Sequence, residues 1–205
     1  MQRNTTTPRR DWKATVEAQG LLFHTADGTP YWDESAYYGF SMDEIDRIEA
    51  AANELQRLCL LAGDRILEEG RFAEFAIPES AIDWIRETWE AEPPALYGRF
   101  DLAYDGLGPP KLLEYNADTP TSLLEAAAIQ WYWLEDCFPR LDQFNSIHER
   151  LVDKWRDLAP SLRGKVYFAH LDHTEDVMTV TYLRDTAEQA GLKTDGILMP
   201  DIGWD

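Results

Sequence analysis

The chain has 205 residues, and its 38 acidic side chains against 19 lysines and arginines give a formal net charge of −19 at pH 7. This acidic balance argues against nucleic acid as a partner, because the phosphate backbone rewards clustered lysine and arginine, and it also disfavours anionic membrane surfaces. The N-terminal segment has no apolar run, so we expect neither a secretory signal nor a membrane anchor. Two cysteines provide no disulfide framework and suit a reducing compartment, so we expect a cytoplasmic protein.

Two helices are predicted before residue 92. Ser41 and Glu44 have the spacing of a capping box, and apolar residues then recur at steps of three and four until Gly70. Residues 78–90 predict a second helix that begins with proline. We expect the first helix to pack on a sheet rather than form a coiled coil, because its pattern spans only about three heptads.

Two segments with strand alternation follow. Residues 96–104 and 111–116 flank a loop at 105–110 that is dense in turn residues. Two strands joined in this way are typical of a β-hairpin with a longish loop.

Four polar side chains of this hairpin form a candidate site. Arg99 and Asp101 point the same way, because side chains on a strand alternate between its faces. Glu114 and Asn116 share a face of the second strand for the same reason. If the register stacks these faces, Asp101, Glu114 and Asn116 supply the oxygen ligands that Mg²⁺ prefers, while Arg99 adds a planar fork that matches phosphate. The alternative is a surface hairpin in which Arg99 and Asp101 pair with their neighbours.

The residues after the hairpin lead into an apolar segment. Ser122 and Glu125 have the spacing of a capping box that opens a helix. A helix N-terminus offers free amide donors and the positive end of the helix dipole. Candidate residues for binding a substrate carboxylate or phosphate are therefore Asp118, Thr119, Thr121 and Ser122. Capping alone also explains Ser122, and turn formation alone explains Asp118.

The last part of the chain is mostly architectural. Helices are predicted over residues 123–138 and 144–158, and we interpret the aromatic residues Trp131, Tyr132 and Trp133 as core rather than as a ligand platform. A strand, a helix and a second strand are then predicted over residues 165–171, 174–190 and 193–199. Such a βαβ unit favours parallel strands. His170, Asp172 and His173 follow the first of these strands, and we interpret them as a polar loop rather than a metal site.

Three stretches of the chain carry a family resemblance. LLEYNADTPTSLLEAAAIQWYWLED, with YGRFD upstream and FHTADGTPYWDESAYY near the start, resembles the glutathionylspermidine synthase family, from about Asp11 to Asp205. The resemblance implies an ATP-dependent ligase that joins a carboxylate to an amine through an acyl phosphate. It implies an ATP–Mg²⁺ site formed by the four hairpin residues, with Arg99 as the catalytic group. It also implies that Thr119 and Thr121 face a thiol-tripeptide substrate.

Two departures from the family pattern affect the expected function. The loop Thr119-Pro120-Thr121 is stiffer and bulkier than the small serines of authentic glutathionylspermidine synthases, which leaves the acid and the amine substrates open. The 205 residues contain no segment that resembles the amidase domain that some members carry in front, so we expect no thiol hydrolase chemistry from them.

The resemblance also predicts the organisation of the chain. We expect a mixed α/β fold in which residues 1–160 form a helical and hairpin region and residues 161–205 begin a pre-ATP-grasp-like βαβ unit of an incomplete ATP-grasp fold. A tryptophan next to the last residue suggests an N-terminal portion, with little ligase activity alone. The alternative function is a non-catalytic module that binds a peptide thiol or a partner, and we expect an exposed apolar face that supports self-association.

Overall fold

The computed structural model describes residues 1–118 and 120–203, and the fold is mixed α/β, as predicted. The chain divides into two units: unit 1 consists of Met1 and Phe40–Ala117, and unit 2 of Gln2–Gly39 and Asp118–Asp205. In the described residues the strands form four two-stranded sheets. The division that we expected near residue 160 stays a prediction.

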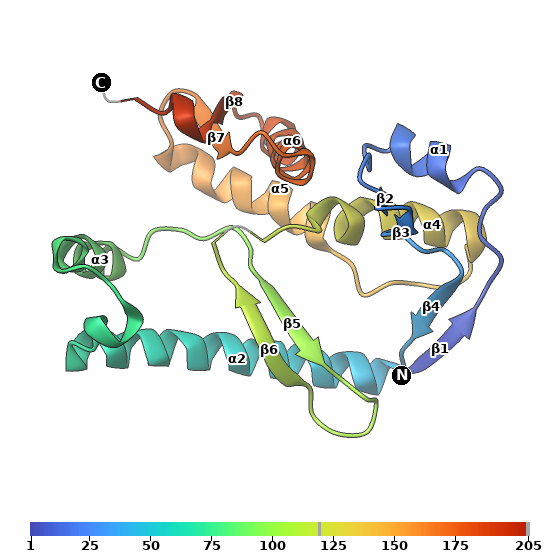
Figure 1. The fold of residues 1–205 in the computed structure, drawn as a ribbon, viewed down its shortest axis with the longest axis horizontal. Helices are drawn as coiled ribbons and strands as arrows, with labels where there is room; N and C mark the ends of the chain where they lie inside the picture. The colour runs from blue at the N-terminus through green and yellow to red at the C-terminus, as the bar shows by residue number, and fades with distance from the viewer. Residues whose placement is uncertain (119, 204–205) are drawn as a thin grey trace. The chain divides into compact units, whose positions relative to one another are not determined.

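Unit 1 contains two helices and the predicted hairpin (Figure 1). Helix α2 (Met42–Glu69) begins at the predicted capping box, in which Ser41 and Glu44 exchange both hydrogen bonds, and it ends at Gly70 in the left-handed conformation. A 3₁₀ turn, Phe72–Phe75, leads to α3 (Glu79–Ala91). Strands β5 (Arg99–Ala103) and β6 (Lys111–Asn116) pair antiparallel, so both helices and the hairpin are confirmed.

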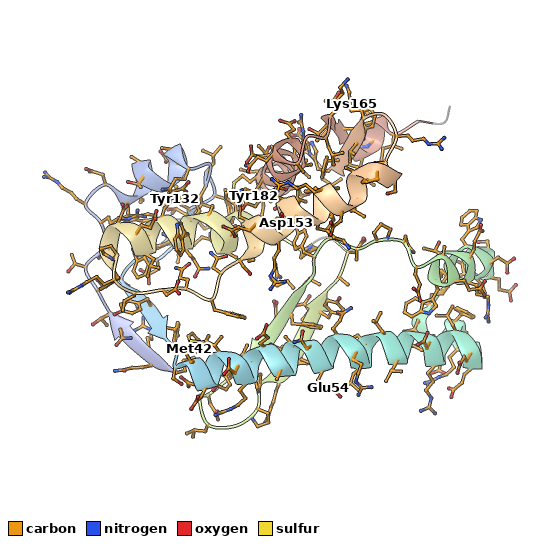
Figure 2. All side chains as sticks on the ribbon, turned by 180° about the vertical axis from the view of Figure 1, so that it is seen from behind. Met42, Glu54, Tyr132, Asp153, Lys165 and Tyr182 are labelled. Atoms are coloured by element: carbon orange, nitrogen blue, oxygen red, sulfur yellow. The ribbon has the colours of Figure 1, made fainter. Side chains whose placement is uncertain are left out.

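The hydroxyl groups of two tyrosines connect the β5–β6 hairpin to α2. Tyr115 donates to Oε1 of Gln56 at 2.7 Å, and Tyr104 donates to Oε1 of Glu44 at 3.4 Å. No residue of α2 is buried, and its side chains project from both sides of the helix in Figure 2. Phe72 is the buried apolar residue of unit 1 among those described. This unit therefore holds together with few buried apolar side chains.

The N-terminal part of unit 2 contains elements that the sequence patterns did not predict. Strand β1 (Gln2–Thr5) pairs antiparallel with β4 (Ala36–Gly39). Helix α1 (Trp12–Ala18) and the short strands β2 (Thr25–Ala26) and β3 (Thr29–Pro30) lie between them in the chain. These elements are too short for a periodic apolar pattern to reveal them.

The C-terminal part of unit 2 follows the predicted order. Residues 123–137 are helical, with a π-helical segment, Glu125–Ile129, before α4 (Gln130–Cys137). Helix α5 (Ile147–Leu158) and a 3₁₀ turn, Ala159–Ser161, come next. Strands β7 (Val166–His170) and β8 (Thr194–Leu198) pair in parallel on either side of α6 (Thr174–Gln189), before a 3₁₀ turn, Met199–Asp201. The βαβ unit is therefore confirmed.

Most of the buried apolar side chains belong to unit 2 and come from α1, the helical residues 123–137, α5 and α6. Of the three neighbouring aromatic residues, Trp133 is buried and packs on Tyr37, with ring centroids 5.5 Å apart. Trp131 and Tyr132 are 37% and 47% exposed, so the interpretation of these two as core was wrong. Their helix presents one face to the core and another face to solvent.

In the described part of the chain, no helix combines the length and the apolar character that a membrane span requires.

Candidate functional site

The register of the hairpin stacks the two predicted polar faces. Arg99 lies opposite Asn116, and Asp101 lies opposite Glu114. The pairing then shifts between Asp101 and Leu102, because Leu102 pairs with Leu112 and an extra residue is left on β6. Such bulges are frequent beside functional sites, where they redirect a side chain. This register meets the condition that we set for the candidate site.

Hydrogen bonds connect the four polar side chains in a row. Nε of Arg99 donates to Oδ1 of Asp101 at 2.8 Å. With its amide oriented to satisfy both neighbours, Asn116 accepts from Nη2 of Arg99 at 3.1 Å and donates to Oε1 of Glu114 at 3.2 Å. About a third of each side chain in the Arg99–Asp101 ion pair is exposed. Solvent screening limits such a pair to about 1 kcal/mol or less, so stability alone gives little reason for this cluster.

The charges of this cluster favour a cation. Asp101 and Glu114 are like charges in directly opposite positions, which is unfavourable in a sheet unless a positive group lies between them. Arg99 supplies one positive charge next to Asp101. The two carboxylates and the oxygen of Asn116 form a set of hard oxygen donors, which is the kind that Mg²⁺ binds. These three residues therefore fit a magnesium ion.

Among the described residues, no group of three or more His, Cys, Asp or Glu side chains could hold a metal ion, and the hairpin contributes two such side chains, Asp101 and Glu114. His170 contacts the carbonyl oxygen of Leu171 through Nδ1 at 2.8 Å. The polar-loop interpretation of His170, Asp172 and His173 stays a prediction.

Tyr97 precedes the cluster on the same segment. Burial raises the pKa of its hydroxyl to about 12, and the nearby charge of Arg99 opposes part of this increase. The pKa of Tyr97 therefore indicates a half-buried environment beside the Arg99 guanidinium.

Ser122 and Glu125, at the end of the predicted substrate loop, do not form the capping box that we predicted. Ser122 has a φ of +63°, in the left-handed region, whereas a capping residue has an extended backbone. The hydroxyl of Tyr31 lies 3.1 Å from Oγ of Ser122 and donates to Oε1 of Glu125 at 3.0 Å. Because the single hydroxyl hydrogen of Tyr31 goes to Glu125, Ser122 must donate to Tyr31. Tyr31 is therefore hydrogen-bonded to both side chains that would have formed the capping box.

Tyr31 and Glu125 are functional candidates that sequence reasoning missed. Glu125 is buried and begins the π-helical segment, and π-helical turns are frequent at functional sites. Burial raises the pKa of Tyr31, so its hydroxyl stays protonated and can donate. The only sequence signal for Tyr31 was its position in the stretch FHTADGTPYWDESAYY.

The structure divides the predicted site residues between the two units. The four hairpin residues belong to unit 1, whereas Asp118, Thr121 and Ser122 belong to unit 2. Thr119, and Trp204 near the chain end, lie outside the described residues. In unit 1 the β5–β6 register brings all four hairpin residues together, whereas in unit 2 the hydroxyl of Tyr31 contacts Ser122 among the predicted residues.

Comparison with known proteins decides the family. The model of the glutathionylspermidine synthase preATP-grasp family matches residues 3–205. The chain belongs to this family. The resemblance inferred from the sequence stretches is therefore confirmed, and so is the pre-ATP-grasp fold class.

Named members and relatives of the glutathionylspermidine synthase family are ligases. A candidate acid–amine ligase of Haemophilus influenzae is 42% identical over 188 residues, which cover 88% of this chain and 47% of that protein. The trypanothione synthetase of Crithidia fasciculata is 31% identical over 66% of this chain and 21% of its own length. The bifunctional glutathionylspermidine synthetase/amidase of Escherichia coli is 27% identical over 94% of this chain and 30% of its own length. The chain thus spans less than half the length of each of these relatives.

Proposed function

We propose that the chain supplies the magnesium–phosphate and substrate-binding elements of an ATP-dependent ligase that joins a carboxylate to an amine. The observation that carries the proposal is the β5–β6 register, which places two opposed carboxylates, an amide oxygen and a guanidinium on one face. The ligase names of the family relatives support the same reaction class.

Each hairpin residue has a role in this proposal. Asp101, Glu114 and Asn116 would hold Mg²⁺ through their oxygen atoms. Bound Mg²⁺–ATP would supply the γ-phosphoryl group that activates the substrate carboxylate as an acyl phosphate, with ADP as the leaving group. The amine would then attack the acyl carbon and displace phosphate to form the amide. Arg99 is the proposed catalytic residue, because its planar fork orients phosphoryl oxygens and stabilises the charge that develops on them.

The loop after the hairpin has a role in substrate binding. Asp118, Thr119, Thr121 and Ser122 would bind a small-molecule or peptide carboxylate, and Tyr31 holds Ser122 in its left-handed conformation through their hydrogen bond. A left-handed backbone at a residue other than glycine persists only where surrounding contacts impose it, and such positions cluster at ligand sites. We propose a cytoplasmic location for this reaction, as the acidic composition and the two cysteines suggest.

Calorimetry of Mg²⁺-dependent ATP binding tests the proposal. We would titrate the 205-residue chain and any longer product that its coding sequence encodes, each as wild type and as Glu114→Gln. We expect the longer product to bind ATP. Chelation of Mg²⁺ should abolish this binding, and Glu114→Gln should weaken it about tenfold or more. Glu87→Gln, at an exposed position of α3, is the matched control and should bind like wild type.

Two outcomes of this titration discriminate clearly. Absence of binding in both proteins, with both folded, would overturn the magnesium site. If neither Glu114→Gln nor Glu87→Gln changes the affinity for ATP, the nucleotide binds at another site. We expect the 205-residue chain alone to show little ligase activity.

A second candidate function is an interaction module that associates with a second copy of itself. Large apolar side chains that are exposed to solvent on α2 and α3 favour this function. Leu58, Leu60 and Leu61 are each nearly half exposed, and Trp84 is 71% exposed. Sedimentation velocity over a wide concentration range tests it. Concentration-dependent association that Leu61→Glu removes would support the module, and a monomer at every concentration would oppose it.

A further inference from the structure

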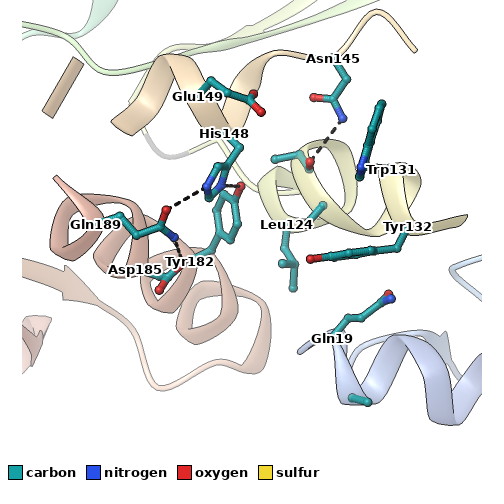
Figure 3. Close-up of a pocket in the computed structure, with 13 residues that line it drawn as sticks. Gln19, Leu124, Trp131, Tyr132, Asn145, His148, Glu149, Tyr182, Asp185 and Gln189 are labelled. Carbon is teal, nitrogen blue, oxygen red and sulfur yellow. Dashed lines mark hydrogen bonds between the residues drawn. The ribbon is translucent and has the colours of Figure 1, made fainter. Parts of the chain in front are cut away.

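Unit 2 contains a pocket of about 680 Å³ that involves none of the residues assigned to the proposed ligase site (Figure 3). We call it the α4–α6 pocket. Its walls come from the end of α1, the helical residues 123–137, the start of α5 and the second half of α6. A volume of several hundred Å³ is typical of sites for small organic molecules, so the question is which chemistry the walls select.

One wall of the α4–α6 pocket is an ordered polar row. Nδ1 of His148 lies 2.7 Å from the hydroxyl of Tyr182, and Nε2 lies 3.2 Å from Oε1 of Gln189. Gln189 in turn donates to Oδ2 of Asp185 at 2.8 Å. Because Oε1 of Gln189 can only accept, Nε2 of His148 carries a hydrogen and donates. Both ring nitrogens are therefore engaged within the wall, while the Asp185 carboxylate can still accept from a ligand.

The opposite side of the pocket holds an acceptor without a donor. Oε1 of Gln19, at the end of α1, is buried and has no hydrogen-bond partner among the described residues. A buried acceptor of this kind is unfavourable until something donates to it. Figure 3 shows the Gln19 side chain beside the ring of Tyr132. Rotation of the Gln19 side chain toward the pocket would let the N–H group of a ligand satisfy this atom.

The charged side chains that line the α4–α6 pocket are acidic. Glu149 and Asp185 contribute carboxylates, and no lysine or arginine lines the pocket among the described residues. The exposed aromatic side chains of Trp131 and Tyr132 add ring faces, which attract cations. Most of the remaining lining is alanine and leucine, with one asparagine, Asn145, and this apolar part can contact an apolar body. The walls therefore select positive charge, hydrogen-bond donors and an apolar body in the same ligand.

We propose that the α4–α6 pocket binds an arylalkylamine in its protonated form. The primary ammonium group donates to Gln19 and to the carboxylates, and the aromatic body packs against Trp131 and Tyr132. Two carboxylates and a large aromatic surface suit such a molecule better than a bare metal ion, which requires several converging oxygen ligands. The proposal does not depend on the ligase function, because none of the pocket residues belongs to the proposed ligase site.

Binding of three matched compounds to the wild-type 205-residue chain tests the chemistry of the ligand. We would titrate 2-phenylethylammonium, its N-trimethyl derivative and neutral 2-phenylethanol by calorimetry. We expect 2-phenylethylammonium to bind most tightly, the trimethyl derivative to bind more weakly because it lacks N–H donors, and the alcohol to bind most weakly because it lacks charge. Equal binding of the amine and the alcohol, or no binding of the amine at millimolar concentration, would overturn the proposal.

Substitutions test the location of the site. Asp185→Asn and Glu149→Gln should each weaken 2-phenylethylammonium binding by roughly threefold to tenfold, and Gln19→Leu should reduce the preference for the amine over its trimethyl derivative. The matched control is Glu135→Gln, at an exposed position of α4 outside the lining. Glu114→Gln should leave amine binding unchanged, which separates this proposal from the ligase proposal. If the pocket variants are folded by circular dichroism and bind the amine like wild type, the site lies elsewhere and the proposal fails.

Discussion

At the scale of single residues, Glu34 is a carboxylate of unit 2 whose side chain has no exposed surface. It accepts hydrogen bonds from Nη2 of Arg9 at 2.5 Å, from the backbone N–H of Arg9 at 3.2 Å and from Nε1 of Trp32 at 3.1 Å. Arg9 also donates to Oδ2 of Asp136 at 2.6 Å. A buried charge with these partners links the segment before α1 to the end of α4.

We predict that Glu34→Ala lowers the free energy of unfolding by about 3–5 kcal/mol, because it leaves the Arg9 guanidinium without its buried partner. Asp136→Ala is the matched control, since Asp136 contacts the same guanidinium but is 55% exposed, and its loss should cost about 1 kcal/mol or less. Urea unfolding measures both changes. Equal effects of the two substitutions would show that burial of Glu34 does not govern the energy.

Glu44 makes stability depend on pH. Its pKa is lowered from 4.5 to about 2, first by the hydrogen bond from the amino group of Met1 and then by the bond from the backbone N–H of Ser41. A carboxyl whose pKa is lower in the folded state stabilises that state fully above its unfolded pKa, and the contribution disappears as pH falls. The relevant window therefore extends from about pH 4.5 down to about pH 2.

We predict that Glu44→Gln lowers the Tm at neutral pH and that the difference from wild type shrinks as the pH falls through this window. Thermal unfolding of both proteins at several pH values measures the effect. Glu49→Gln, at an exposed position of the same helix, should follow the wild-type pH profile. A Tm difference that does not change between neutral pH and pH 2 would contradict the assigned role of the Glu44 charge.

At the scale of elements, the contact between α2 and α3 depends on a glycine. A Cβ atom at Gly63 would lie 2.4 Å from Cη2 of Trp89, so the indole ring occupies the space that any side chain at position 63 needs. Trp89 also donates to Oδ1 of Asp64 at 2.8 Å. A glycine in the interior of a helix is otherwise unfavourable, by about 0.5–1 kcal/mol relative to alanine. Packing of Trp89 against Gly63 compensates for this cost in helix stability.

We predict that Gly63→Ala has opposite effects in two backgrounds. In the wild type it should displace Trp89 and lower the free energy of unfolding. In a Trp89→Ala background it should raise that free energy by about 0.5–1 kcal/mol, because only the gain in helix propensity remains. Urea unfolding of the four proteins gives the complete cycle, and effects of the same sign in both backgrounds would disprove the packing argument.

Two predicted capping boxes show what decides an element boundary. Ser41 and Glu44 form theirs, because both partners lie within one helical turn and the main competing contact, from Met1, uses the other oxygen of Glu44. Ser122 and Glu125 have the same spacing, but Tyr31 contacts both and the backbone of Ser122 is left-handed. The same local pattern therefore has different outcomes where a residue from another part of the chain intervenes.

At the scale of the whole molecule, the net charge of −19 acts on stability. Acidic side chains outnumber basic ones by two to one, so the exposed charges repel one another on balance, and compaction increases the repulsion. Salt screens this repulsion over the distances that separate surface charges. The few exposed ion pairs, such as Arg57 with Glu54, weaken with salt but contribute little.

We predict that the Tm rises when ionic strength increases from about 0.01 M to about 0.15 M, because the Debye length falls from about 30 Å to about 8 Å. Thermal unfolding in sodium chloride measures the change, and choline chloride at equal ionic strength controls for specific sodium binding. A Tm that is constant or falls with salt would show that ion pairs outweigh net repulsion.

Sequence patterns were enough to predict the α2 and α3 helices, the β5–β6 hairpin and the parallel βαβ unit. Their causes are local: apolar periodicity, caps within one turn, and side chains that alternate along a strand. The buried Glu34 network, the Tyr31 contact with Glu125 and the α4–α6 pocket depend instead on long-range packing. The partners in these features lie up to 127 residues apart, and no periodic pattern encodes which of many polar side chains will meet when the intervening chain folds.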